Sequence, residues 1–202
     1  MRLEIIVPYN RDSAARERNR ELFENFWWEY DYHIIEDYTE RARAYNEFAS
    51  NSTADIIALA DIDAHIPSES IHEAMEMFED GADVVYPFTR IENVYPDSDR
   101  PNDVWPAYYD KGLFPMFKRT SFIAMGGENE LFQGYGWEDL ERYFRALNND
   151  YDVRRVDGVA HHMDHGWRSR MGNPHIRSNW ELMKVERDEY ENRINDRADR
   201  RR

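Results

Sequence analysis

The segment at residues 54–63 constrains the fold most, because a short apolar run ends there in two acids one residue apart. It reads Ala-Asp-Ile-Ile-Ala-Leu-Ala-Asp-Ile-Asp and follows a polar Asn-Ser-Thr stretch. Such a run is typical of a strand buried on both faces of a parallel sheet, and these sheets bind ligands beyond the carboxyl ends of their strands. Asp61 and Asp63 would repel each other there unless a cation lay between them, and Mg²⁺ and Mn²⁺ favour hard oxygen ligands. The segment therefore predicts a metal site or, more simply, a turn or a helix cap.

Strand and helix patterns alternate through the first ninety residues. Apolar runs alternate with amphipathic stretches, and a capping box of Ser70 and Glu73 marks the start of the third helix. We expect strands at residues 3–7, 32–37, 55–60 and 84–88, and helices at about 13–30, 39–50 and 70–81. This order predicts an α/β fold with a mostly parallel sheet flanked by helices on both faces.

The alternation stops after residue 88. Residues 89–112 contain three prolines, several acids and no clear period, so we expect a long loop there. Beyond it, we expect strands at residues 113–117, 153–156 and 159–162, and helices starting at residues 120, 138 and 179.

The charge balance narrows the class of protein. The 202 residues include 41 acidic and 26 basic side chains, a formal net charge of −15, which argues against a general nucleic-acid-binding protein. Only Lys111, Lys118 and Lys184 are lysines. This bias resembles the proteins of salt-loving microbes, or else an acidic protein from a GC-rich genome. The absence of cysteine excludes disulfides and thiolate sites, and no apolar run reaches the ~18–20 residues of a transmembrane segment.

A second group of candidate functional residues lies between residues 126 and 139. Four glycines within eleven residues allow a close approach to a ligand, and the aromatic rings of Phe132, Tyr135 and Trp137 suit the flat face of a sugar. Glu138 and Asp139 then begin a helix, whose N-terminus favours negative charge. The simpler alternative is a glycine-rich turn whose acids only complement the helix dipole.

Histidines form a third group. Three of the seven histidines fall within residues 161–165, after the last expected strand. Imidazole binds Mn²⁺ beside carboxylates, so one of them could complete a site begun by Asp63. The alternative is a polar surface turn.

A resemblance to a known family rests on four segments in order. Residues 126–140 resemble the G-W-G-G-E-D segment of metal-dependent GT-A glycosyltransferases, in particular β-1,4-galactosyltransferases and polypeptide N-acetylgalactosaminyltransferases. Tyr135 and Trp137 depart from that segment, which has Trp and Gly there. Ile-Ile-Val-Pro-Tyr at residues 5–9, Arg-Ala-Arg-Ala-Tyr-Asn at 41–46 and Asp-Ile-Asp at 61–63 resemble the family's other motifs. The resemblance covers roughly residues 3–166.

The resemblance implies a GT-A-like, Rossmann-like fold with a small irregular subregion on the acceptor side. It implies a single catalytic domain over residues 1–180, with a nucleotide-binding half (1–90) and an acceptor and metal half (91–180), and a charged helix or tail at 181–202. It also implies a hexosyltransferase that uses a nucleotide-sugar, in particular a UDP-sugar, and a glycan, glycolipid or glycoprotein acceptor. We expect such a protein in the cytoplasm, or at the inner membrane surface through its acceptor.

The same resemblance implies roles for individual residues. Asp139 would act as the base of an inverting transfer, and Glu138 would position sugar hydroxyls. Asp63 and His165, with His162 second, would hold Mn²⁺ or Mg²⁺, with Asp63 and His165 within about 5 Å of each other. The donor would contact Pro8, Tyr9, Arg11, Arg41, Asn46, Asp61 and Asp63, and the acceptor would contact Tyr135, Gly136 and Trp137.

Three alternatives remain open. A nucleotidyltransferase usually has a glycine-rich basic loop after the first strand, whereas residues 8–12 contain no glycine. A non-catalytic carbohydrate-binding protein would be favoured if Asp139 faced away from the metal site. A retaining enzyme is the third alternative, because two acids of this spacing do not report stereochemistry.

Overall fold

The computed structural model describes residues 1–199 except 11–13, 37–39, 97, 108–111 and 166–172, with side chains described to residue 195. The larger sheet contains β1 (Leu3–Tyr9), β2 (Tyr32–Glu36), β3 (Ile56–Leu59), β5 (Val84–Tyr86), β8 (Met116–Lys118) and β9 (Val153–Arg155). The smaller sheet contains β4 (Ala64–His65), β6 (Arg90–Val94), β7 (Asp103–Pro106) and β10 (Val159–Met163). The helices are α1 (Ala14–Phe26), α2 (Arg41–Asn51), α3 (Ser68–Glu79), α4 (Arg119–Ala124), α5 (Glu138–Asn148) and α6 (Ile176–Asp199).

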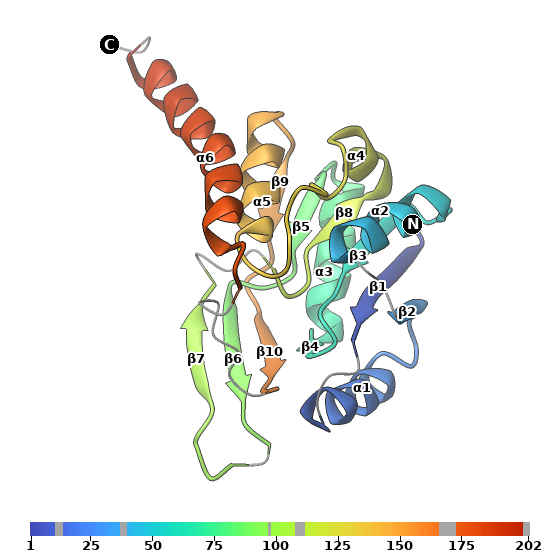
Figure 1. The fold of residues 1–202 in the computed structure, drawn as a ribbon. Helices are drawn as coiled ribbons and strands as arrows, with labels where there is room; N and C mark the ends of the chain where they lie inside the picture. Colours follow the sequence, from blue (N-terminus) through green and yellow to red (C-terminus); the bar gives the residue numbers. More distant parts are fainter. Residues whose placement is uncertain (11–13, 37–39, 97, 108–111, 166–172, 200–202) are drawn as a thin grey trace.

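The larger sheet is mostly parallel, as the sequence predicts. Its strand order is β2-β1-β3-β8-β5-β9, and that of the smaller sheet is β4-β10-β6-β7 (Figure 1). Only β8 is antiparallel to its neighbours in the larger sheet, and the other strands run in one direction. The carboxyl ends of β1 and β3 therefore meet at one edge, where open α/β sheets bind ligands.

Helices cover both faces of the larger sheet. On β1, Ile5 packs in a core that includes Phe23 of α1 and Phe78 of α3. The next side chain, Ile6, packs in a second core with Tyr45 of α2 and residues of α4 and α5. Because successive side chains of a strand point to opposite faces, burial on both faces requires the continuous apolar runs seen in the sequence.

Residues 90–106 differ from the expected long loop. There β6 and β7 form an antiparallel hairpin, and β6 also pairs in parallel with β10. In β6 only Ile91 is fully buried, so the strands lack the apolar run that marks β3. The pairing of β6 with β10 stabilises a polar hairpin that the local sequence does not indicate.

The start of α3 also differs from expectation. The helix begins at Ser68 after Pro67, and no side chain caps it. Ser70 lies inside the helix and is buried, and a Cβ on Gly158 would lie 2.6 Å from its Oγ. The predicted capping box of Ser70 and Glu73 is therefore wrong, because Ser70 packs against the turn before β10.

The charged C-terminal segment forms α6, which begins at Ile176, packs along α5 and extends beyond it (Figure 1). In the part of the chain that the structure describes, we find no helix with the length and apolar character that crossing a membrane requires.

Candidate active site

The candidate site lies beyond the carboxyl end of β3, where the first residues of α2 and α5 and the end of β10 converge. Arg41, the first residue of α2, donates to Asp61 Oδ1 at 2.6 Å. The backbone N–H of Met163 in β10 donates to the carbonyl of Asp63 at 2.9 Å. A cavity of about 430 Å³ opens here, and Asp61, Asp139 and His162 all line it. The fold thus brings together three motifs that are spread over about a hundred residues of the sequence.

Asp63, His162 and His165 form a compact cluster. The Nε2 atoms of His165 and His162 lie 3.2 Å and 3.8 Å from Asp63 Oδ2. One ligand atom from each residue lies within 4.8 Å of the other two. The expected approach of Asp63 and His165 within about 5 Å is confirmed. A cation coordinated at ~2.1 Å places neighbouring ligand atoms roughly 3.0–3.4 Å apart, close to this spacing.

The charge of this cluster also suits a divalent cation. Asp63 is 4% exposed, and a buried carboxylate is costly without a positive partner. Among the described residues, no Arg or Lys forms an ion pair with Asp63, and its recorded partners are imidazoles. One carboxylate and two imidazoles are a suitable donor set for Mn²⁺.

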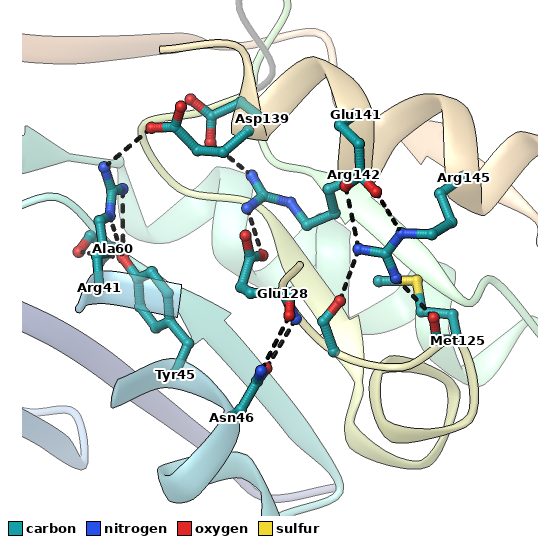
Figure 2. A network of polar contacts seen from close by, with 12 residues as sticks. Arg41, Tyr45, Asn46, Ala60, Met125, Glu128, Asp139, Glu141, Arg142 and Arg145 are labelled. Atoms are coloured by element: carbon teal, nitrogen blue, oxygen red, sulfur yellow. Dashed lines mark hydrogen bonds and ion pairs between the residues drawn. The ribbon is translucent and has the colours of Figure 1, made fainter. Parts of the chain in front are cut away.

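Arg41 links the acids of two motifs. Its guanidinium bonds Asp61 and lies 3.8 Å from Glu138 Oε1. It also lies over the ring of Tyr45, 5.5 Å from its centre (Figure 2). Arg41 therefore places a positive charge between the end of β3 and the start of α5.

Burial changes the ionisation of two acids beside Arg41. It raises the pKa of Asp61 to about 6, and the charge of Arg41 opposes this shift. Burial, with the charge of Asp139, raises the pKa of Glu138 to about 7, again opposed by Arg41. Glu138 is also fixed in place, because the backbone N–H of Gly136 donates to its Oε2 at 2.6 Å.

Arg142 is a site residue that the sequence analysis missed. Its Nη2 donates to Asp139 Oδ1 at 2.8 Å, and its Nη1 donates to Glu128 Oε1 at 2.5 Å (Figure 2). The Arg142 side chain is only 2% exposed. The helical spacing from Asp139 to Arg142 was a usable signal, but the contact with Glu128 depends on the path of the glycine-rich loop.

The glycine-rich loop brings aromatic side chains to the cavity. Tyr135, which is 49% exposed, lines the cavity with Gly136 and Trp137. Trp137 has a left-handed backbone with φ 77°, a conformation that glycine adopts without strain, and its ring packs edge-on against Trp180. Trp137 therefore holds a backbone conformation that a residue other than glycine rarely adopts.

Two further cavity residues come from the segment expected to be a loop. Trp105 on β7 lines the cavity and is 60% exposed, and its place next to Pro106 gave no strand signal. Gly112 also lines the cavity, and a Cβ there would lie 2.6 Å from Asp139 Oδ2. A side chain at position 112 would therefore displace the Asp139 carboxylate.

The predicted donor-binding residues differ in their surroundings. Pro8 and Tyr9 are buried at the end of β1, and Tyr9 belongs to the core beneath α1. Asn46 holds the glycine-rich loop, since it donates to the Glu128 carbonyl at 2.9 Å and accepts from the Glu128 N–H at 2.7 Å (Figure 2). Arg11 lies outside the described residues. The donor-binding roles of these residues stay predictions.

Comparison with known proteins identifies the family. The sequence model of glycosyl transferase family 2 matches residues 5–133. The chain belongs to this family. A second model, the N-terminal domain of galactosyltransferase, matches residues 106–166. Both matches agree with the resemblance found in the motifs. No curated protein matches this glycosyltransferase in sequence.

Solved structures with the same fold include two complexes of Drosophila β1,4-galactosyltransferase 7. The complex with xylobiose has a TM-score of 0.50 at 18% identity, covering 76% of this chain and 64% of the other. A mutant complex with manganese, UDP-Gal and xylobiose has a TM-score of 0.53 at 15% identity, covering 78% and 68%. GalNAc-T7 with UDP, GalNAc and Mn²⁺ has a TM-score of 0.65 at 10% identity, covering 94% of this chain and 50% of the other. The chain thus has a GT-A fold and spans one half to two thirds of these neighbours.

Proposed function

We propose that this protein is a metal-dependent, inverting glycosyltransferase that moves a sugar from a UDP-sugar to a hydroxyl of a glycan, glycolipid or glycoprotein. One observation carries the proposal: a candidate metal ligand, His162, and a candidate base, Asp139, line the same cavity of about 430 Å³. A sugar held between them would meet a metal-bound diphosphate on one side and a base on the other.

Asp63, His162 and His165 would hold the metal. Bound there, Mn²⁺ or Mg²⁺ would contact the donor diphosphate and offset the negative charge that develops on the leaving group. The complexes of the structural neighbours with manganese and UDP or UDP-Gal support this choice of metal and nucleotide. Arg41 adds positive charge beside Asp61, and Asp61 would bind the ribose of the donor.

Asp139 would accept the proton of the acceptor hydroxyl. As that proton leaves, the acceptor oxygen bonds to the anomeric carbon and the bond to the diphosphate oxygen breaks, so a single displacement inverts the anomeric centre. Arg142 fixes one oxygen of Asp139, which holds the carboxylate at the cavity wall. Glu138 would position sugar hydroxyls.

Aromatic side chains would bind the acceptor ring. Tyr135 and Trp105 are exposed and line the cavity, and Trp137 lines it too. Tyrosine and tryptophan offer apolar faces to a sugar ring together with polar atoms for its hydroxyls. This arrangement favours a saccharide acceptor.

The alternatives are less well supported. A carbohydrate-binding protein without activity was expected to have Asp139 facing away from the metal site, whereas Asp139 lines the cavity with His162. Membership of a glycosyl transferase family supports sugar transfer over nucleotidyl transfer.

A donor screen followed by product analysis tests the proposal. Thermal shift with a panel of nucleotide-sugars and Mn²⁺ should show the largest rise in melting temperature for a UDP-sugar. With that donor and an acceptor, NMR of the product should show an anomeric configuration opposite to that of the donor. A product that retains the donor configuration would contradict the inverting mechanism, and a preference for a GDP- or CMP-sugar would contradict the proposed donor.

A further inference from the structure

A row of polar side chains crosses the smaller sheet from the metal cluster to the outer strand. His162 on β10 pairs in register with Asn93 on β6, and Asn93 pairs with Asp103 on β7. The Nδ1 atom of His162 lies 3.0 Å from Oδ1 of Asn93, and Nδ2 of Asn93 donates to Oδ1 of Asp103 at 2.9 Å. Three neighbouring strands thus contribute to one chain of hydrogen bonds that ends on a candidate metal ligand.

Asp103 determines which way the Asn93 amide faces. A carboxylate accepts hydrogen bonds and does not donate them, so the amide NH₂ must face Asp103 and the amide carbonyl must face His162. Hydrogen bonds from Asn93 and Arg100 lower the pKa of Asp103 below its usual value, which keeps it a carboxylate. Arg100 and the hydroxyl of Tyr95 also hold its side chain in place.

The Asn93 carbonyl in turn determines which nitrogen of neutral His162 carries the hydrogen. Because that carbonyl only accepts, Nδ1 must donate, and Nε2 keeps its lone pair. Nε2 is the atom that lies 3.8 Å from Asp63 Oδ2. We propose that Asn93 is a positioning residue, which holds His162 as the Nδ1–H tautomer and so presents Nε2 to the metal. Hydrogen bonds of this kind are known to orient metal-binding histidines.

This inference rests on the proposed metal site and adds the residue that prepares it. The neighbouring residues offer a matched control. His161 Nδ1 lies 2.7 Å from Glu92 Oε2, and this pair precedes His162 and Asn93 by one residue on the same two strands. His161 is not part of the cluster with Asp63 among the described residues.

The first measurement is the tautomer of His162 in the metal-free protein. Long-range ¹H–¹⁵N NMR at about pH 8, where an ordinary imidazole is neutral, should show the hydrogen on Nδ1. The variant N93L, similar in shape but without an acceptor, should lose this preference. The swap N93D/D103N should restore it, because the new carboxylate accepts from Nδ1 and the new amide donates to that carboxylate. E92Q should leave the tautomer of His162 unchanged.

The second measurement is Mn²⁺ affinity by calorimetry. N93L should bind Mn²⁺ about 10–100-fold more weakly than wild type, while the swap and E92Q should stay within about threefold. A wild-type spectrum with the hydrogen on Nε2 of His162 would overturn the inference. This measurement does not depend on any variant being folded. N93L with the wild-type tautomer and affinity would overturn it too. If His162 has the expected tautomer but the wild-type protein binds no Mn²⁺, the proposed metal site is wrong. The role of Asn93 in setting the tautomer of His162 is then still supported.

Discussion

Two acids of the candidate site, Asp63 and Asp139, are neutralised differently. At the end of β3, Asp63 contacts two imidazoles and, among the described residues, no Arg or Lys. At the start of α5, Asp139 and Glu128 share Arg142, whose side chain is 2% exposed. The chain supplies its own cation where a carboxylate must keep a fixed position. Where a cation is expected from solution, it supplies neutral ligands.

This difference has consequences for stability and for binding. Removing Arg142 leaves the buried Glu128 and the partly exposed Asp139 without this partner, so the folded state should be destabilised. Removing Asp63 takes away a charge that no Arg or Lys of the described residues neutralises, so ligand binding should be weakened instead. The predictions below test this contrast from its largest expected effect to its smallest.

The variant D139N should give the largest effect, because it should affect sugar transfer and leave metal-dependent donor binding intact. Loss of a general base lowers the rate of transfer by about 10²–10⁴-fold, whereas Mn²⁺-dependent binding of the donor should stay near wild type. Rate assays and calorimetry with UDP-sugar check the two parts. Transfer near the wild-type rate would mean that the base lies elsewhere, and a parallel loss of donor binding would mean that Asp139 belongs to the metal side.

The variant R142M should destabilise the protein by about 3–5 kcal/mol, because removing one member of a buried ion pair leaves the charge of the other member uncompensated. Urea unfolding measures this change, and E128Q/R142M should recover part of the loss. The control R43M removes an ion pair with Glu47 whose side chains are both 63% exposed, and it should leave the free energy of unfolding nearly unchanged. Similar losses for R142M and R43M would contradict the structural role of Arg142.

The third prediction concerns Glu138, which precedes Asp139 and lies 3.8 Å from the guanidinium of Arg41. Burial raises its pKa to about 7 from the ordinary value of 4.5. When the pKa of an acid is higher in the folded state than in the unfolded state, the acid does not reduce stability at a pH below its unfolded-state pKa. As the pH rises above that pKa, stability falls, and it stops falling once the pH exceeds the folded-state pKa. The stability of E138Q relative to wild type should therefore rise between about pH 4.5 and pH 7 and then level off, by about 1–3 kcal/mol. Urea unfolding across this range in the absence of metal checks it, and a constant difference would contradict the shift.

The sequence predicted the parts of the fold that local patterns specify. The apolar runs of β1 and β3 required burial on both faces, and the acids after β3 marked the ligand-binding edge. The hairpin of β6 and β7 was not predicted, because its polar strands depend on pairing with β10 rather than on their own residues.

The candidate site was predictable to a similar extent. The approach of Asp63 and His165 followed from the motif order and is confirmed at 3.2 Å. Arg142 and Asn93 could not be found in the same way. Glu128, a partner of Arg142, lies in an irregular loop, and Asn93 and its partner Asp103 lie on two strands that the sequence did not indicate.

The most direct test of the central claim is Mn²⁺ binding by the variant D63A, measured by calorimetry with and without UDP. D63A should lose Mn²⁺ affinity and Mn²⁺-dependent UDP binding by at least about 100-fold, while its unfolding free energy without metal should stay equal to or above that of wild type. Unaltered Mn²⁺ binding in a folded D63A protein would show that the cation site is not at the end of β3.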